Sequence, residues 1–211
     1  MLKIKIEIIA LVLTMLIGLF VTNLAIAQED SHTKRIEMTP WDEGWAIGAH
    51  WGKAFEPSST WVEFFTPADW ELIDYHIISV GLRKKILDYD KYFSINSELN
   101  FAHIYGEESY QEVSVTPTIS WNLLPWDDYL DTSVSLGFGL SYSSMVTELD
   151  ETDTKTLISM IFELEFKLPE KDTWSVYTRV HHRSSGADYI GDVISDGGGS
   201  NFPSIGLRYH F

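Results

Sequence analysis

The sequence predicts an all-β protein, an eight-stranded antiparallel transmembrane β-barrel with a cleaved N-terminal signal peptide. The first observation is that apolar and polar residues alternate over most of the chain. The second is a positively charged, then apolar N-terminus that ends in small residues. The third is the aromatic content, 8 Trp, 10 Tyr and 11 Phe in 211 residues, which is typical of the girdles at membrane interfaces.

Residues 1–27 are predicted to be a signal peptide. Lys3 and Lys5 precede an apolar stretch over residues 8–20, and Ala25-Ile26-Ala27 offers a small-x-small cleavage site. An N-terminal membrane anchor is the alternative, because the apolar stretch is nearly long enough to span a bilayer. The remaining residues 28–211 suit one domain, with a polar N-terminal arm over 28–42 and the barrel over 43–211.

Eight segments alternate with a period of two. They cover residues 45–51, 78–82, 93–101, 113–123, 134–140, 158–168, 173–184 and 205–211. Taken together, the apolar faces are uniform and rich in aromatics, and the opposite faces carry mainly Ser, Gly and Asn with a few charges. This distribution favours a membrane barrel, in which apolar side chains face lipid and small or polar ones fill the interior. With no cysteine in the chain, closure of the sheet takes the place of disulfides in holding an exported fold together.

The polar face also carries charges of both signs. They are Glu98, Glu163, Glu165, Arg83, Arg179 and Arg208, and we predict that they neutralise one another inside the barrel. Pro117 lies within a predicted strand, so a bulge or local break in the ladder is expected there.

An even number of strands places both termini of the chain on the same side of the membrane, which for such barrels is the periplasm. The predicted inner turns are 84–91, 124–130 and 169–172, and the predicted outer loops are 54–73, 106–109, 144–155 and 185–200. Leu207, Tyr209 and Phe211 end the chain at alternate positions. This ending resembles the C-terminal strand that the outer-membrane assembly machinery reads, so that machinery is an expected partner and the bacterial outer membrane the expected location.

The formal net charge of −16 argues against nucleic acid as a partner, because phosphate backbones require a basic surface. Glu148, Asp150, Glu151 and Asp153 are predicted to form a solvated acidic loop, with divalent cations bridging them to lipid phosphates as the alternative. His50, His76 and His103 lack metal-ligand spacing, so no metal site is expected at these histidines.

One pair of polar residues ends an apolar strand face. The segment 173–184 places Trp174, Val176, Thr178, Val180, His182 and Ser184 on one face. His182 and Ser184 therefore lie at the outer end of the lipid face. A serine nucleophile needs an adjacent base, and the base needs an orienting acid. The acid candidates are Asp188, Asp192 and Asp196, and the candidate oxyanion donors are Ser185, Asn201 and the backbone of 197–199. The alternative is an interfacial histidine and serine without chemistry.

Three short motifs in this region carry a resemblance. They are His181-His182-Arg183-Ser184-Ser185-Gly186, Gly198-Gly199-Ser200-Asn201 and Gly206-Leu207-Arg208-Tyr209-His210-Phe211. Together they resemble the lipid A 3-O-deacylase family, PagL-like esterases of the outer membrane.

The resemblance implies an eight-stranded barrel that removes the 3-O-linked acyl chain of lipid A without a metal or cofactor. It implies Ser184 as nucleophile, His182 as general base and Asp196 as the acid, where the family usually has glutamate. The family commonly has Asn where this chain has Ser185, so Asn201 is the substitute oxyanion donor.

The expected function is therefore that of an outer-membrane serine esterase acting on lipid A of lipopolysaccharide in the outer leaflet. A non-catalytic small barrel, serving as an adhesin or structural protein, is the alternative. A lipid acyltransferase is a third hypothesis. It is disfavoured because the active site of such an enzyme typically faces the barrel interior, whereas the strand alternation places His182 on the outward face. The preferred acyl chain and the formation of a homodimer are left open.

Overall fold

A computed structural model describes residues 36–56, 70–90, 92–169, 171–185 and 198–211. The predicted signal peptide lies outside these residues. The strands are β1 (Ile36–Met38), β2 (Trp45–Phe55), β3 (Leu72–Tyr89), β4 (Phe93–Gly106), β5 (Tyr110–Trp121), β6 (Asp131–Ser143), β7 (Thr156–Leu168), β8 (Lys171–Ser184) and β9 (Gly199–His210). Within the described ranges, no helix is long and apolar enough to cross a membrane.

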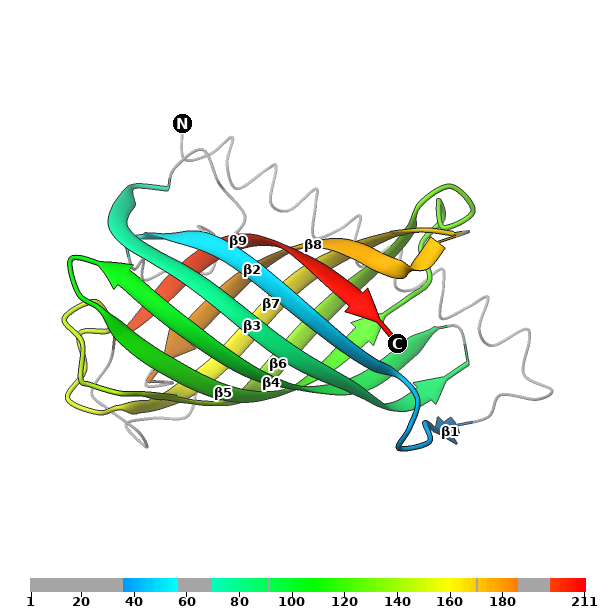
Figure 1. The fold of residues 1–211 in the computed structure, drawn as a ribbon, viewed down its shortest axis with the longest axis horizontal. Coiled ribbons are helices and arrows are strands. Elements are labelled where there is room, and N and C mark those ends of the chain that lie inside the picture. The colour runs from blue at the N-terminus through cyan, green and yellow to red at the C-terminus, as the bar shows by residue number, and fades with distance from the viewer. Residues whose placement is uncertain (1–35, 57–69, 91, 170, 186–197) are drawn as a thin grey trace, which may run out of the picture.

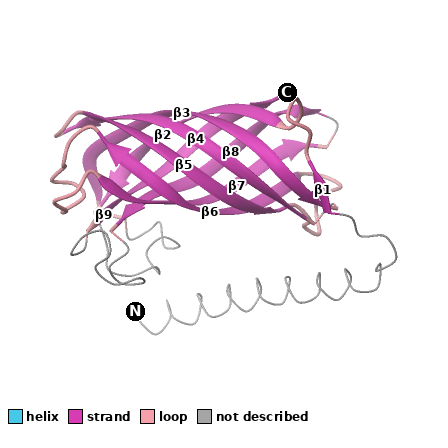
Figure 2. Ribbon diagram, turned by 90° about the horizontal axis from the view of Figure 1, so that it is seen from below, coloured by secondary structure: helices cyan, strands magenta, loops and turns pink. Residues whose placement is uncertain are grey.

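Strands β2 to β9 form one closed antiparallel barrel (Figures 1 and 2). Each strand pairs with the next along the chain, and β9 pairs back with β2, with Ile205 opposite Trp51. Closure leaves none of these eight strands with a free edge over its paired length. The predicted fold class and strand order are confirmed, and the connections 107–109 and 144–155 fall where outer loops were predicted.

The main departure is where β3 joins β4, at the end of the barrel predicted to face the periplasm. The predicted inner turn 84–91 is reduced to residues 90–92, because both strands continue past the point where the alternation stops. A register shift between Lys85 and Leu87 explains the error, since one extra residue exchanges the two faces and hides the period of two. Strand β1, within the predicted polar arm, pairs with this extension.

The predicted interruption at Pro117 is present on one side of its strand. Pro117 pairs with Ser97 of β4, but the ladder between β5 and β6 has pairs at Val115 and Thr118 and none between them. The proline therefore sits in a local break, which accommodates a residue without an amide hydrogen.

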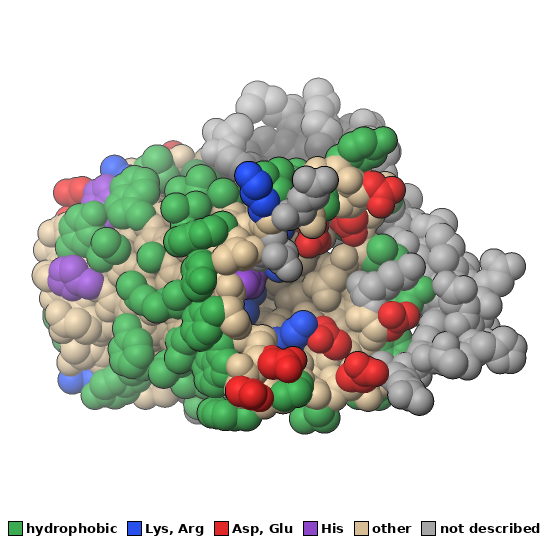
Figure 3. Space-filling model, turned by 45° about the vertical axis from the view of Figure 1, so that its right-hand side comes forward, with side chains coloured by type: hydrophobic (Ala, Val, Ile, Leu, Met, Phe, Trp, Pro, Cys, Tyr) green, Lys and Arg blue, Asp and Glu red, His purple; other side chains and the backbone are tan. Residues whose placement is uncertain are grey.

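The two faces of the barrel are inverted relative to a soluble domain. Outward side chains such as Phe138 (60% exposed) and Ile205 (56%) form an apolar belt, which is visible in Figure 3. Inward side chains such as Glu163 and Arg183 have no exposed surface. Such an arrangement is stable when lipid covers the belt.

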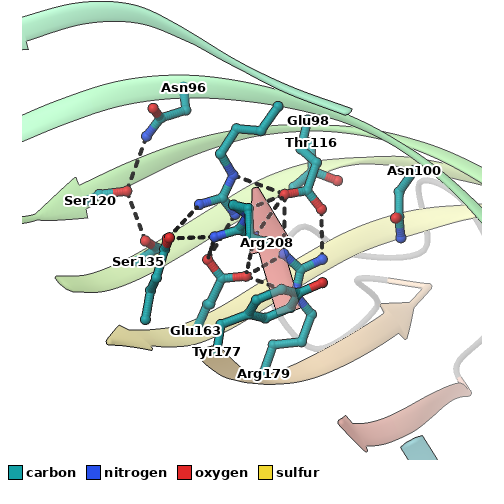
Figure 4. A network of polar contacts seen from close by, with 12 residues as sticks. Asn96, Glu98, Asn100, Thr116, Ser120, Ser135, Glu163, Tyr177, Arg179 and Arg208 are labelled. Atoms are coloured by element: carbon teal, nitrogen blue, oxygen red, sulfur yellow. Dashed lines mark hydrogen bonds and ion pairs between the residues drawn. The ribbon is translucent and has the colours of Figure 1, made fainter. Parts of the chain in front are cut away.

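The six predicted interior charges form one network inside the barrel, and Figure 4 labels four of them, Glu98, Glu163, Arg179 and Arg208. Glu163 contacts Arg83, Arg179 and Arg208, all of which also contact Glu98. Glu165 joins through Arg208. The predicted internal salt-bridge network is confirmed, and its three carboxylates balance its three guanidinium groups.

The two ends of the interior differ. At the end predicted to face the periplasm, the barrel is hollowed (Figure 3). The polar cavity there has a volume of about 420 Å³, and its lining includes Lys85, Asp131 and His210. At the outer end a buried apolar cluster fills the interior, comprising Ala54, Tyr75, Ile77, Ala102, Ile104, Tyr110, Leu149 and Phe202. Leu149 comes from the connection between β6 and β7, so this connection folds into the barrel mouth.

The prediction of a solvated acidic loop is therefore wrong for one member. Asp150 is 1% exposed, and its carboxylate binds Arg183 inside the barrel. Glu148 and Glu151, on either side, are exposed as expected. Leu149 is buried in the apolar cluster at the barrel mouth, which places the neighbouring Asp150 inside the barrel next to the buried Arg183.

Candidate functional site

The candidate site lies at the outer end of β8. Where this strand ends, His181, Arg183 and Ser185 are buried in the interior, whereas His182 and Ser184 are partly exposed on the outer surface. The structure thus places the two side chains on the same outward face, as the period of two requires.

The histidine is held through its Nδ1 atom. Nδ1 lies 2.6 Å from Oδ1 of Asn201 and 3.2 Å from the backbone carbonyl oxygen of Ser200. Both partners accept hydrogen bonds, so Nδ1 carries the hydrogen and donates it. In the neutral imidazole of His182, Nε2 is then the basic nitrogen.

Asn201 reaches the histidine because the two residues are direct cross-strand neighbours. β8 and β9 pair with His182 opposite Asn201, and the asparagine is 2% exposed. The sequence predicts Asn201 as an oxyanion donor, whereas the structure gives its amide oxygen to the imidazole. The register between β8 and β9 is the signal that would have shown this contact, and the alternation within each strand does not fix that register.

The two neighbouring strands give the pair a polar side and an apolar side. On β9, His182 faces Asn201 and Ser184 faces Gly199. On β7, the corresponding partners are Met160 and Ile158. The site therefore lies on a boundary, with the Asn201 amide and the Ser200 carbonyl toward β9 and hydrocarbon toward β7.

The surface around the histidine is more covered than the lipid belt below it. Met160 and Val180, which lie beside His182 on β7 and β8, are each 8% exposed, compared with 43% for Val176 further down β8. Outward side chains beside His182 are thus less exposed than those of the belt, although the strand parity is the same.

The remaining predicted residues are not brought to the pair in the same way. The backbone amide of Ser185 donates to the carbonyl of Gly198 at 3.1 Å, so that amide is not offered to an outer ligand. Asp188, Asp192, Asp196 and Gly197 lie outside the described residues.

The other histidines take up separate positions. Nδ1 of His50 lies 3.1 Å from the Tyr177 hydroxyl in the interior, and His181 contacts Glu112 there. His76 and His103 each stack on Tyr105 at the outer surface. Over the described ranges, no group of three or more His, Asp or Glu side chains could hold a metal ion.

Solved structures with similar folds support the barrel fold of this chain, and at their low sequence identity they do not identify its site residues. The outer membrane enzyme PagL matches over 79% of this chain and 99% of its own, with a TM-score of 0.53 and 13% identity. The chain has the fold of an outer-membrane β-barrel. Neisserial surface protein A matches over 80% of this chain and 97% of its own, with a TM-score of 0.48 and 9% identity. No protein-family model and no curated protein sequence matches the chain.

Proposed function

We propose that this outer-membrane barrel is a serine esterase that removes an ester-linked acyl chain from lipid A. The observation that carries the proposal is the tautomer of His182, whose Nδ1–H is fixed by Asn201 and Ser200. A general base for serine needs its Nδ1–H held in this way so that Nε2 can take a proton. Ser184, two residues along the same face, is the hydroxyl that such a base serves.

The reaction divides into two steps. Nε2 of His182 takes the proton of the Ser184 hydroxyl while Oγ attacks the ester carbonyl carbon, and the imidazolium returns the proton to the departing sugar oxygen. Water then attacks the acyl-serine with Nε2 again as the base, which releases the fatty acid and restores both side chains.

An acceptor facing Nδ1 holds the imidazole in the productive tautomer. The side-chain acceptor described above is the neutral amide of Asn201, which lies nearer to Nδ1 than the Ser200 carbonyl does; an asparagine also holds the histidine in cysteine proteases with a Cys-His-Asn triad. Asp196, implied by the family resemblance, is the alternative for this position. The amide nitrogen of Asn201 also remains our candidate donor to the oxyanion.

The surroundings suit a lipid substrate. The scissile ester of an acylated sugar joins a polar headgroup to hydrocarbon, and the site joins the polar Asn201 of β9 to the apolar Met160 and Ile158 of β7. We infer that the acyl chain lies along β7 and the sugar toward β9. Lipid A of lipopolysaccharide is the acylated glycolipid that the motif resemblance implies, with the 3-O-linked chain as the one removed.

Mass spectrometry of lipid A from expressing and non-expressing cells tests the proposal. Expression is expected to remove the mass of one hydroxy-fatty acid, and Ser184→Ala is expected to abolish that loss. Ser97→Ala is the matched control, because Ser97 also lies on the outward face, on β4 away from the site. Heat-modifiable migration in gels shows that each variant folds.

Each result has a definite meaning. Unchanged lipid A in cells that contain the folded wild-type protein rejects the esterase and favours a non-catalytic barrel. An increase in lipid A mass identifies an acyltransferase. Full deacylation by the Ser184→Ala variant rejects the assigned nucleophile.

A further inference from the structure

A carboxylate inside the barrel is bound to both strands that carry the outer site. Asp150, in the connection between β6 and β7, accepts from the guanidinium of Arg183 through Oδ2. Its other oxygen, Oδ1, accepts from the Ser200 hydroxyl at 2.7 Å. All three residues are at most 1% exposed, so these bonds lie in the interior.

The two partners of Asp150 are chain neighbours of the site residues. Arg183 lies between His182 and Ser184, and its side chain points inward while theirs point outward. Ser200 precedes Asn201, and the Ser200 carbonyl accepts from Nδ1 of His182. One carboxylate therefore fixes the backbone of β8 at the His-x-Ser pair and the backbone of β9 at the groups that orient the imidazole.

The connection that supplies Asp150 is itself anchored. The backbone amide of Asp150 donates to Oγ1 of Thr147 at 3.1 Å, and Leu149 is buried in the apolar cluster at the barrel mouth. Arg183 donates further bonds to Oγ of Ser141 at 2.9 Å and to the carbonyl of Lys155 at 3.2 Å. These contacts make the connection a fixed support for the carboxylate.

The backbone next to Asp150 also meets β9 closely. A Cβ atom built on Gly198 would lie 2.1 Å from the carbonyl oxygen of Asp150, and Gly198 has φ of +90°. Both the space and the backbone conformation therefore require glycine at this position. The start of β9 and the connection are in direct contact as well as hydrogen-bonded.

We propose that Asp150 is a positioning residue for the His182–Ser184 pair and acts through the wall of the barrel. The inference rests on the esterase proposed above and adds the interior group on which the external geometry depends. Without its charge, Arg183 keeps only Glu112, 3.9 Å away, as a carboxylate partner among the described residues. The guanidinium then moves toward Glu112, and the β8–β9 ladder loses the added side-chain link that Asp150 makes between Arg183 and Ser200.

Asp150→Asn tests the proposal, with Asp153→Asn as the matched control. Asp153 lies in the same connection, undergoes the same chemical change and is exposed. The Asp150→Asn variant is expected to lower kcat for lipid A deacylation roughly 10- to 100-fold with little change in KM, because displacements of about 1 Å cost about that much in an oriented reaction. The control is expected to keep the wild-type kcat.

Nitrogen-15 NMR of histidine-labelled protein in detergent micelles gives a readout that a purely structural role does not move. The Nδ1–H signal of His182, assigned by its loss in His182→Gln, is expected to shift and to exchange faster with water in Asp150→Asn. Asp150→Glu, which keeps a carboxylate, is expected to restore part of the rate and of the signal.

The outcomes separate this proposal from the esterase proposal. A wild-type His182 signal in folded Asp150→Asn overturns the positioning role, whatever the rate. Equal changes in Asp150→Asn and Asp153→Asn also overturn it. If the wild-type protein leaves lipid A unchanged, the esterase is rejected, but the NMR comparison still decides whether Asp150 positions His182.

Discussion

The buried charge network makes a quantitative prediction about stability. Glu163 is fully buried and contacts three guanidinium groups, those of Arg83, Arg179 and Arg208. Glu163→Gln keeps the shape of the side chain and leaves three buried cations facing two carboxylates. Breaking a buried ion pair by removing one partner typically costs about 3–5 kcal/mol. At 1.4 kcal/mol per tenfold, the folding equilibrium falls by roughly two to three and a half orders of magnitude.

Urea unfolding in phospholipid vesicles, followed by tryptophan fluorescence and by heat-modifiable migration, measures this loss. Glu37→Gln is the control, because Glu37 is exposed in β1. The double variant Glu163→Gln with Arg208→Met restores the balance of charge and is expected to recover most of the stability. A Glu163→Gln variant within about 1 kcal/mol of wild type would refute the reasoning, because so small a loss falls in the range of exposed ion pairs.

Three further predictions concern the wall and the site. Gly139→Ala is expected to destabilise the barrel by about 1–3 kcal/mol in the same urea assay, because the added Cβ would lie 2.0 Å from a carbonyl oxygen of β5. Gly48→Ala is expected to cost less, because the atom nearest to its added Cβ is a hydroxyl oxygen at 3.1 Å. Phe138→Arg, in the middle of the lipid-facing side of β6, is expected to cost about 2–4 kcal/mol, and equal stability to Phe138→Leu would contradict the membrane assignment of this face. Asn201→Leu is expected to lower kcat roughly 100-fold because it removes the acceptor that faces Nδ1 of His182. Asn201→Asp is expected to retain activity because it keeps such an acceptor. A larger loss of kcat in Asp196→Asn than in Asn201→Leu would assign the orienting role to Asp196.

Local pattern predicted the fold because the period of two carries its information within each strand. Alternation alone assigned Phe138 and Ile205 to the outer face and Glu163 and Arg179 to the interior, and the structure agrees. The pattern was lost where a register shift exchanged the faces, at Lys85, and there the predicted turn was too long. Whether a residue faces in or out is therefore local, provided that the strand is regular.

Partners are a different matter, because they join strands that the chain brings together only on closure. Arg179 and Glu98 are 81 positions apart and share two hydrogen bonds inside the barrel. Opposite charges on inward faces predicted such a network as a class, since a closed lumen must neutralise its charges. Which carboxylate meets which guanidinium depends on the stagger of all the strands between them.

The candidate site shows the same division. The sequence by itself determined that His182 and Ser184 share an outward face at the end of a strand, because their spacing of two fixes this in any regular strand. Only the tertiary structure decided that Asn201 faces Nδ1 of the histidine and that Asp150 is buried against Arg183. Cross-strand register and the folding of a connection into the barrel mouth set these contacts, and both depend on the closed sheet as a whole.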